Sequence, residues 1–262
     1  MTAITKLVKT GRRHIEMSKV IFDGDMFIYK SAFSSEVETR WDDNIWTMHS
    51  DINKAKVDIE ISMGEIMAKL DRTDMVVALS DGENFRNEIF PQYKLNRKDT
   101  RKPLGIKELR GWVLKNYKCV MRSRLEADDI CGILCTRNKD YIAVSGDKDF
   151  GTLPITWYNH LSGDLKTTTK QEADQFHLIQ TLTGDTTDGY QGLPGVGPKT
   201  AEKIFQKSGY LWSTVVAAYQ KKGFDEEDAL VTARLSHILR DEDVDWDTGK
   251  TKIKLWEPKP TK

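Results

Sequence analysis

Nine carboxylates in this sequence stand where short apolar runs end or where helices are expected to begin. They are Asp23, Asp81, Glu126, Asp128, Asp129, Asp147, Asp149, Asp185 and Asp188. Like charges gathered in this number can coexist only if cations neutralise them. The set contains no histidine or cysteine, and hard oxygen ligands suit magnesium or manganese. The pattern therefore predicts a divalent-metal centre, although any one pair of these acids has the simpler interpretation of a solvated loop.

The charges of the chain are strongly segregated. Forty Lys and Arg balance forty Asp and Glu, yet residues 86–124 hold twelve basic residues against three acids, a net charge of +9. Residues 225–247 hold nine acids against two arginines, a net charge of −7. This segregation favours a polyanionic ligand and a bound cation. Taken alone, the charges fit equally well a solvated basic face followed by an acidic one.

A glycine-rich turn follows the last of the carboxylates. In Gly195-Val196-Gly197-Pro198-Lys199 the two glycines allow a tight turn, and Thr200 begins the next expected helix. Backbone N–H groups in such a turn are free to face a phosphate. The turn is a candidate site for a nucleic-acid backbone, and its alternative is an ordinary connection between two helices.

Three apolar runs indicate the elements that must position these residues. The runs are residues 20–22, 75–79 and 141–144, and they are followed by Asp23, Asp81 and Asp147 respectively. Expected helical segments separate the three runs. Such alternation predicts parallel strands with crossover helices, hence an α/β fold. Ligands of open α/β sheets bind at the carboxyl ends of the strands, so the three aspartates should meet at one edge.

The expected helices are spread along the whole chain. They run from about Asp43 to Leu70, from Leu125 to about Asn138, over residues 171–182 and over residues 200–207. Acids in the first turn of the second helix also suit the helix dipole, which is the structural alternative to metal binding. Cys131 and Cys135 lie on its apolar side and are expected in the core.

Composition excludes several classes of protein. The chain has 262 residues, of which 39% are hydrophobic and 31% charged, and it has three cysteines. No run approaches the roughly 20 apolar residues of a membrane span, and the N-terminus lacks the apolar stretch of a signal peptide. Three cysteines make no disulfide framework. We expect a cytoplasmic protein without a membrane partner.

The motifs together resemble the 5′ nuclease superfamily of flap endonucleases and 5′→3′ exonucleases, and most closely the podophage 5′→3′ exonucleases. The resembling segments are IFDGD (21–25), ALSDGENFR (78–86), PQYKLNRK (91–98), LEADD (125–129), VSGDKDF (144–150) and GDTTDGYQGLPGVGPKTAEKI (184–204). They cover about residues 19 to 207. Asp25 adds an acid where many relatives have a neutral residue, so its role is open.

The resemblance implies a three-layer, PIN-like core with a mostly parallel sheet, a helical arch or clamp, and a helix-three-turn-helix DNA-binding lobe. It also implies two metal sites. Asp23, Asp81, Glu126 and Asp128 are expected to hold the first Mg²⁺, with Asp147 and Asp149 close to it. Asp129, Asp185 and Asp188 are expected to hold the second ion, and Mn²⁺ is expected to substitute.

The same resemblance assigns roles to the basic residues. Lys94 and Arg97 match the cations beneath the arch that stabilise charge on the scissile phosphate, with Arg86 in support. Tyr93 stacks on a frayed base or is simply a packed aromatic residue. The other expected DNA contacts, with K⁺ expected at the hairpin, are Lys98, Arg101, Gly195, Val196, Gly197, Lys199 and Thr200.

The predicted activity is metal-dependent 5′→3′ exonuclease cleavage of duplex DNA, with removal of flaps and of RNA primers. RNA–DNA hybrids are expected as further substrates, and replication proteins as partners. A dedicated flap endonuclease is the first alternative, and a catalytically inactive DNA-binding module is the second.

Three regions are expected along the chain. Residues 1–18 form an extension, residues 19–170 the nuclease core with the basic arch segment 84–118, and residues 171–262 the lobe and tail.

Overall fold

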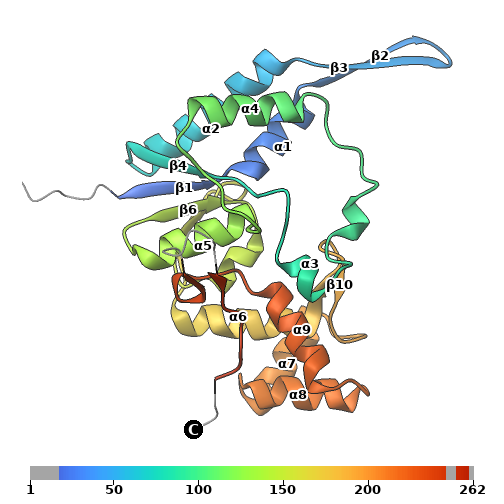
Figure 1. Ribbon diagram of the computed structural model, residues 1–262, viewed down its shortest axis with the longest axis vertical. Coiled ribbons are helices and arrows are strands. Elements are labelled where there is room, and N and C mark those ends of the chain that lie inside the picture. Colours follow the sequence, from blue (N-terminus) through green and yellow to red (C-terminus); the bar gives the residue numbers. More distant parts are fainter. Residues whose placement is uncertain (1–17, 246–251, 260–262) are drawn as a thin grey trace, which may run out of the picture.

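The computed structural model describes residues 18–245 and 252–259, and a six-stranded sheet lies at its centre (Figure 1). The strand order is β5-β4-β1-β6-β7-β8, and only β8 runs antiparallel to its neighbour. The strands are β1 (Lys19–Asp23), β4 (Asp74–Ala78), β5 (Cys119–Val120), β6 (Ile142–Ser145), β7 (Thr156–Asn159) and β8 (Asp164–Thr167). The predicted α/β fold with a mostly parallel sheet is confirmed.

The three apolar runs predicted as strands form the middle of this sheet. Ile21 of β1 pairs with Val76 of β4 on one side and with Ala143 of β6 on the other. Because the three strands are parallel, the residues that follow them emerge at the same edge. That edge receives Asp23, Asp81 and Asp147, as the sequence predicts.

Helices cover both faces of the sheet. The helices α1 (Gly24–Ser34), α2 (Ile52–Lys69) and α4 (Ile106–Asn116) lie on one face, and α5 (Ala127–Arg137) lies on the other. Phe22 packs toward the first group, whereas Ile21 packs toward α5, since successive side chains of a strand point to opposite faces. The expected three-layer core follows from this alternation. Cys131 and Cys135 are buried in it, as predicted.

A helical lobe follows the sheet along the chain. Its helices are α6 (Lys170–Thr183), α7 (Pro198–Ser208), α8 (Trp212–Lys221) and α9 (Glu226–Ser236), and the short strands β9 (Gly184–Asp185) and β10 (Tyr190–Gln191) connect α6 to α7. The Thr169 hydroxyl accepts a hydrogen bond from the backbone N–H of Glu172, which begins α6 with a capping box. Leu182, Phe205 and Val215 form a separate apolar core for this lobe. The two helices predicted here are confirmed.

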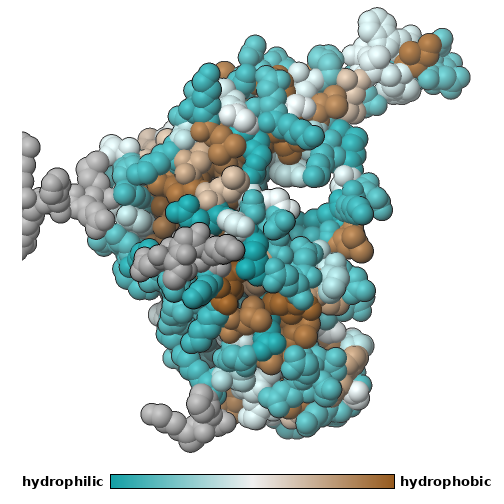
Figure 2. All heavy atoms as spheres, viewed as in Figure 1, coloured by the Kyte–Doolittle hydropathy of each residue, from teal (hydrophilic) through white to brown (hydrophobic). Residues whose placement is uncertain are grey.

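The helix predicted from Asp43 begins nine residues later, because residues 36–50 form a hairpin. Strands β2 (Glu36–Asp42) and β3 (Ile45–Ser50) pair antiparallel, and they extend from the body as an arm with apolar atoms near its end (Figures 1 and 2). Ile45, Trp46 and Thr47 favour strand over helix. The Asp51 side chain then caps α2 by accepting a 3.0 Å hydrogen bond from the Lys54 N–H.

The basic segment crosses from the lobe side of the molecule back to α4. It contains α3 (Arg86–Ile89), the 3₁₀ turn η1 (Leu95–Arg97) and an extended stretch that leads to α4. Figure 2 shows this stretch standing away from the body, with an opening beside it. The short helices and the opening are features expected of the helical arch that the resemblance implies.

The C-terminal tail returns to the nuclease core. Ile238 and Leu239 are buried with α5 in the second apolar cluster. The remaining short elements are η2 (Lys148–Thr152), η3 (Asp241–Asp243), β11 (Val244–Asp245) and β12 (Lys252–Ile253). The boundary at residue 170 therefore remains a prediction, because part of the predicted lobe region packs against the core. Nearly all of the 1–18 extension lies outside the described residues.

Among the helices of residues 18–245 and 252–259, none combines the length and the apolar character that crossing a bilayer requires.

Candidate active site

Asp23 is the last residue of β1 and is 7% exposed. The Ser145 hydroxyl donates a 3.0 Å hydrogen bond to its Oδ2. Burial, together with the nearby charges of Asp25 and Asp147, raises the pKa of Asp23 to about 7, although the hydrogen bond from Ser145 acts in the opposite direction. The neighbouring strands β1 and β6 thus bring the predicted ligands Asp23 and Asp147 close together.

Asp81 lies in the loop after β4 and is held by backbone groups. The Arg124 N–H donates a 3.0 Å hydrogen bond to Oδ2 of Asp81, and the Asp81 N–H donates a 2.9 Å hydrogen bond to the Leu125 carbonyl. Backbone donors from Arg124 and Gly82 lower its pKa. This loop runs beside the segment that leads to α5, so it places Asp81 next to the LEADD motif.

Glu126, Asp128 and Asp129 form a compact carboxylate group at the start of α5. One ligand oxygen from each lies within 4.8 Å of the others. Glu126 and Asp129 make a capping box, in which each side chain accepts from the other's backbone N–H. Desolvation raises the pKa of Asp128 well above its usual value, and the charges of Asp129 and Glu126 raise it further.

Asp129 has a different environment from its two neighbours. It is fully buried, and its two oxygens accept 2.8 Å hydrogen bonds from the guanidinium of Arg86. Oδ1 also accepts from the Leu239 N–H at 3.0 Å. Arg86 is 2% exposed and further donates to the carbonyls of Leu235 and His237. This pair joins α3, α5 and the C-terminal tail, and both oxygens of Asp129 already accept hydrogen bonds.

Asp147 and Asp149 follow β6 in the turn that leads into η2. The Asp149 N–H donates 2.9 Å to Oδ1 of Asp147. Gln180 of α6 donates its side-chain amide to Oδ1 of Asp149 at 2.5 Å. Desolvation and the charges of Asp185 and Asp188 raise the pKa of both carboxyls, and the net pKa of Asp149 is about 7. These repulsions show that the β6 and β9 acids share one electrostatic environment.

Asp185 and Asp188 flank a tight turn between β9 and β10. Oδ1 of Asp185 accepts from the Thr187 N–H at 2.7 Å, which fixes the turn. The Tyr93 hydroxyl lies 3.0 Å from Oδ2 of Asp188 and 3.0 Å from Oε2 of Glu126. Tyr93 therefore joins the β9–β10 acids to the α5 acids.

The basic segment meets this carboxylate group directly. Lys94 is ion-paired with Glu126, its ammonium lies 3.6 Å from Asp188, and Arg97 is ion-paired with Asp188. Burial would raise the pKa of Glu126, but the charges of Lys94 and Arg86 hold it at about 2. The segment thus places two cations beside carboxylates that come from two separate parts of the chain, the start of α5 and the β9–β10 turn.

The carboxylate group fits hard divalent cations. Its donors are oxygens, and neighbouring acids raise the pKa of several of them, so the site carries more negative charge than its own lysine and arginines neutralise. Oxygen ligands at this density suit magnesium or manganese. Asp23, Asp81, Glu126, Asp128, Asp147, Asp149, Asp185 and Asp188 have the donor chemistry that such ions require.

The glycine turn lies in the helical lobe and not among these carboxylates. Val196 is buried, Gly195 has a left-handed φ of 76°, and Gly197 immediately precedes α7. Lys199 and Thr200 are exposed in the first turn of that helix. The turn therefore presents the N-terminus of a helix with a cation beside it, which is an anion-binding arrangement.

Three further predicted residues have individual positions. Tyr93 is 5% exposed and its ring stacks on Tyr190, which favours the packed alternative over base stacking. Lys98 is exposed after η1. Arg101 makes two hydrogen bonds of 2.6 and 2.8 Å to Glu36 of the hairpin, so it lies away from the carboxylate group.

Sequence reasoning did not single out Ser145, Gln180 or Ser80. Ser145 stands two residues before Asp147 in VSGDKDF, and Gln180 stands five residues before Asp185. Their proximity to the acids in sequence is a weak signal, since only the fold shows that their side chains contact Asp23 and Asp149. Ser80 directly precedes Asp81, and its hydroxyl accepts a 3.0 Å hydrogen bond from the Ala127 N–H.

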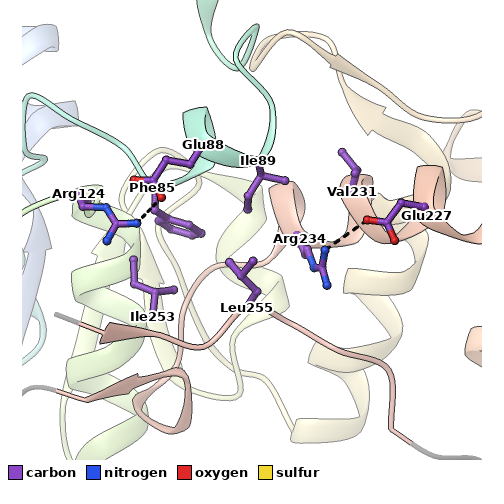
Figure 3. Close-up of a pocket in the computed structure, with 9 residues that line it drawn as sticks. All are labelled: Phe85, Glu88, Ile89, Arg124, Glu227, Val231, Arg234, Ile253 and Leu255. Carbon is purple, nitrogen blue, oxygen red and sulfur yellow. Dashed lines mark hydrogen bonds and ion pairs between the residues drawn. The ribbon is translucent and has the colours of Figure 1, made fainter.

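A pocket of about 400 Å³ lies between α3, α9 and the C-terminal tail (Figure 3). Phe85, Ile253 and Leu255 supply apolar walls, and none of the carboxylates described above lines it. Its two arginines are paired, Arg124 with Glu88 and Arg234 with Glu227. The pocket is therefore distinct from the candidate site.

Known proteins similar to this chain include phage exonucleases. The exodeoxyribonuclease of Enterobacteria phage T3 is 29% identical, with 92% of this chain and 93% of that protein covered. The exonuclease of Escherichia phage T7 is 28% identical, with 91% and 93% covered. Flap endonuclease Xni of Shewanella halifaxensis is 29% identical over 61% of this chain and 70% of its own length.

Solved structures share the fold. The T5 D15 protein co-crystallised with metal ions has a TM-score of 0.64 at 14% identity, covering 84% of this chain and 89% of that one. The bacteriophage T5 D15 flap endonuclease in a pseudo-enzyme-product complex with DNA and metal ions has a TM-score of 0.62 at 15% identity, covering 84% and 88%.

The family model for the 5′–3′ exonuclease N-terminal resolvase-like domain matches residues 18–179. That match spans β1 to α6, and so it includes the edge of the sheet where the strand-end aspartates meet and the basic segment that reaches them. Since it covers more than half of the chain, this protein belongs to the 5′–3′ exonuclease family.

Proposed function

We propose that this family member is a divalent-metal-dependent 5′→3′ exonuclease that acts on duplex DNA and removes flaps. One observation carries the proposal: in the basic segment, Lys94 is ion-paired with Glu126 and Arg97 is ion-paired with Asp188. Cations set among carboxylate ligands provide for both partners of phosphodiester hydrolysis, the metal ions and the phosphate. The phage relatives named above, an exodeoxyribonuclease and an exonuclease, support the same activity.

The donors suit two Mg²⁺ ions, with Mn²⁺ as a substitute. Asp23, Asp81, Glu126 and Asp128 would hold one ion, and Asp185 and Asp188 would hold the other, with Asp147 and Asp149 near both. When bound, two such ions supply an activated water and stabilise the leaving oxygen in an in-line displacement. We remove Asp129 from the predicted ligands, because Arg86 and Leu239 occupy its oxygens.

The residues of the basic segment have separate tasks. The Lys94 side chain is 24% exposed, so its ammonium can exchange its carboxylate partners for a phosphate oxygen and stabilise charge that develops there. Arg97 is 47% exposed and can hold an adjacent phosphate. Arg86 is buried, so its task is to hold Asp129 and Glu126 in place, without touching substrate.

The glycine turn and α7 would hold the duplex at a distance from the cleavage site. Gly195, Gly197, Lys199 and Thr200 are exposed at a helix N-terminus, where we propose that they, with Val196 of the same turn, contact phosphates without reading sequence. A K⁺ ion at the turn is part of this proposal. Lys98 is proposed to contact the strand that passes the arch.

The finer aspects of the activity belong to the same proposal. We propose that RNA–DNA hybrids are substrates, that replication proteins are partners and that the enzyme acts in the cytoplasm. A dedicated flap endonuclease is the second candidate, which the Xni relatives and the T5 flap endonuclease structure support. An inactive DNA-binding module is disfavoured, because no acid position in the matched motifs is replaced.

The test is cleavage of a 5′-labelled duplex and of a matching 5′-flap substrate, with Mg²⁺ and with EDTA. We expect Mg²⁺-dependent release of mononucleotides from the duplex as the first product. Release of the intact flap with no attack on the duplex would favour the flap endonuclease. DNA binding in Mg²⁺ without cleavage of either substrate would contradict the proposal.

A further inference from the structure

Arg110 is a basic residue of α4 whose side chain turns back to the nuclease core. Its Nη1 donates a 2.6 Å hydrogen bond to Oδ1 of Asp25, and its Nη2 donates to the carbonyl of Ser80. Asp25 belongs to α1 and Ser80 to the loop after β4. One guanidinium therefore ties the helix at the end of the basic segment to two elements of the core.

Ser80 extends this connection to a third element. Its N–H donates 2.9 Å to Oδ2 of Asp25, and its hydroxyl accepts 3.0 Å from the N–H of Ala127, the first residue of α5. Arg110, Asp25, Ser80 and the start of α5 thus form a continuous hydrogen-bonded set.

The three members of this set that Arg110 connects are close neighbours in sequence of proposed metal ligands. Asp25 is two residues from Asp23, Ser80 directly precedes Asp81, and Ala127 directly follows Glu126. A small shift of the set would move three ligands relative to one another. Residues that hold ligands in this way affect metal affinity almost as strongly as the ligands do.

The carboxylate of Asp25 is fully engaged in these contacts. One oxygen accepts from Arg110 and the other from the Ser80 N–H. Its role is therefore to hold neighbouring groups, which explains an acid that the metal site itself does not need. Arg110 also balances the negative charge of Asp25, which otherwise acts on Asp23.

We propose that Arg110 is a positioning residue, through which α4 and the basic segment hold Asp23, Asp81 and Glu126 in the geometry that binds metal. The inference rests on the proposed function, because the metal site is what the residue positions. It goes further by assigning a structural coupling between the segment that meets DNA and the site that binds the ions.

The test measures metal binding first, without DNA, so that its outcome is separate from catalysis. Mn²⁺ is titrated into the full chain and followed by calorimetry for Arg110→Gln, Asp25→Asn and the double variant. We expect each single variant to weaken the tighter Mn²⁺ site about tenfold. The double variant should be no weaker than the single ones, because both changes break the same set.

Lys115→Gln is the matched control, since Lys115 is an exposed cation of the same helix. It should leave Mn²⁺ affinity unchanged. Wild-type Mn²⁺ affinity in Arg110→Gln, or equal losses in the control, would overturn the inference. If the wild type binds Mn²⁺ but cleaves no DNA, the proposed function fails while the coupling is still measured.

Arg110→Lys separates positioning from a direct DNA contact. Lysine restores the positive charge but not the fork that reaches Asp25 and Ser80 together. We expect this variant to keep wild-type DNA affinity in Ca²⁺ and to need about tenfold more Mg²⁺ for half-maximal cleavage. If lysine restores the Mg²⁺ requirement, and glutamine lowers only DNA affinity, Arg110 is a phosphate contact and the inference is wrong.

Discussion

The ammonium group of Lys94 is ion-paired with the carboxylate of Glu126, a residue 32 positions later in the chain. The contact joins the basic segment to the start of α5. Burial would lower the pKa of Lys94, but Glu126 and Asp188 raise it, so the lysine is charged at neutral pH. A charged lysine placed among metal ligands is suited to act on a phosphate that those metals bind.

Lys94→Ala should therefore slow the chemical step more than it weakens binding. A cation at the developing charge of a phosphate contributes several kcal/mol, so the single-turnover rate should fall about a hundredfold or more. The DNA dissociation constant in Ca²⁺ should change much less. Lys94→Arg should recover only part of the rate, since its planar fork differs from a compact ammonium.

The measurement is the single-turnover rate on a 5′-labelled duplex at saturating enzyme, beside equilibrium binding in Ca²⁺. Lys118→Ala is the control, because it removes an exposed charge near the other end of the basic block. An unchanged rate at saturation with lower affinity would show that Lys94 is only part of a solvated basic surface.

Much of the fold was predictable because each strand carries its own signal. The runs around Ile21, Val76 and Ala143 are continuously apolar, as strands buried on both faces must be. The acids that follow them could be assigned to one sheet edge from topology alone. Apolar spacing could not identify the hairpin, because its side chains pack against no core. Trp41 is 70% exposed and Trp46 is 52% exposed.

The candidate site was predictable in its acids but not in their partners. The LEADD motif offers three carboxylates in a row, and spacing alone cannot tell which one faces a metal. The contact between Asp129 and Arg86, which lies 43 residues earlier, is what leads us to propose a role other than metal binding for Asp129. Contacts such as those of Ser145 and Gln180 depend on packing between distant elements, which one sequence does not encode locally.

Asp147→Ala and Asp149→Ala should abolish cleavage while leaving most DNA binding intact. Both carboxylates lie where the acids of β6 and β9 interact, so losing either disturbs the proposed metal ions. Most binding energy comes from phosphate contacts elsewhere. The assay is Mg²⁺-dependent release from labelled DNA together with binding in Ca²⁺, and Glu65→Ala on the exposed side of α2 is the control. Near-normal turnover by either variant would remove that residue from the metal assignment.

The glycine turn should contribute affinity without sequence preference. Lys199→Ala combined with Gly197→Asp removes one cation and adds a carboxylate at the N-terminus of α7. A side chain at Gly197 meets no atom within 4 Å, so the change should not disturb the fold. Binding to all duplex sequences should weaken alike, and the slope of log affinity against log salt should become smaller by about one phosphate contact or more.

The measurement is duplex affinity across a salt series for several sequences. Lys207→Ala provides the comparison, because it lies at the far end of the same helix and removes the same charge. Changed sequence preference with an unchanged salt slope would contradict the proposed backbone contact.

The carboxylates should also make the stability of the metal-free protein depend on pH. The folded-state pKa of Asp23 and of Asp149 is about 7, against 3.8 in an unfolded chain, with burial as the largest cause. A raised carboxyl pKa contributes stability that is fully present below about pH 4 and is lost as pH rises through about 7. Above pH 7 the metal-free site is therefore a strained group of like charges.

Divalent ions should reverse this loss, because they bind the ionised carboxylates. We expect Mg²⁺ to raise the free energy of unfolding at pH 8 by about 2–3 kcal/mol when present at roughly a hundredfold its dissociation constant. At pH 5.5 the gain should be less than half as large, because Asp23 and Asp149 are then mostly protonated and protons compete with the metal.

Urea unfolding with Mg²⁺ and with EDTA at each pH gives this difference directly. The paired comparison is necessary because burial lowers the pKa of His177 to about 3, which costs stability as pH falls below 6.5 in both samples alike. Asp149→Asn should reduce the Mg²⁺ gain at pH 8, and Glu65→Gln should leave it unchanged. An equal Mg²⁺ gain at both pH values in the wild type would show that the raised carboxyl pKa values do not belong to a metal site.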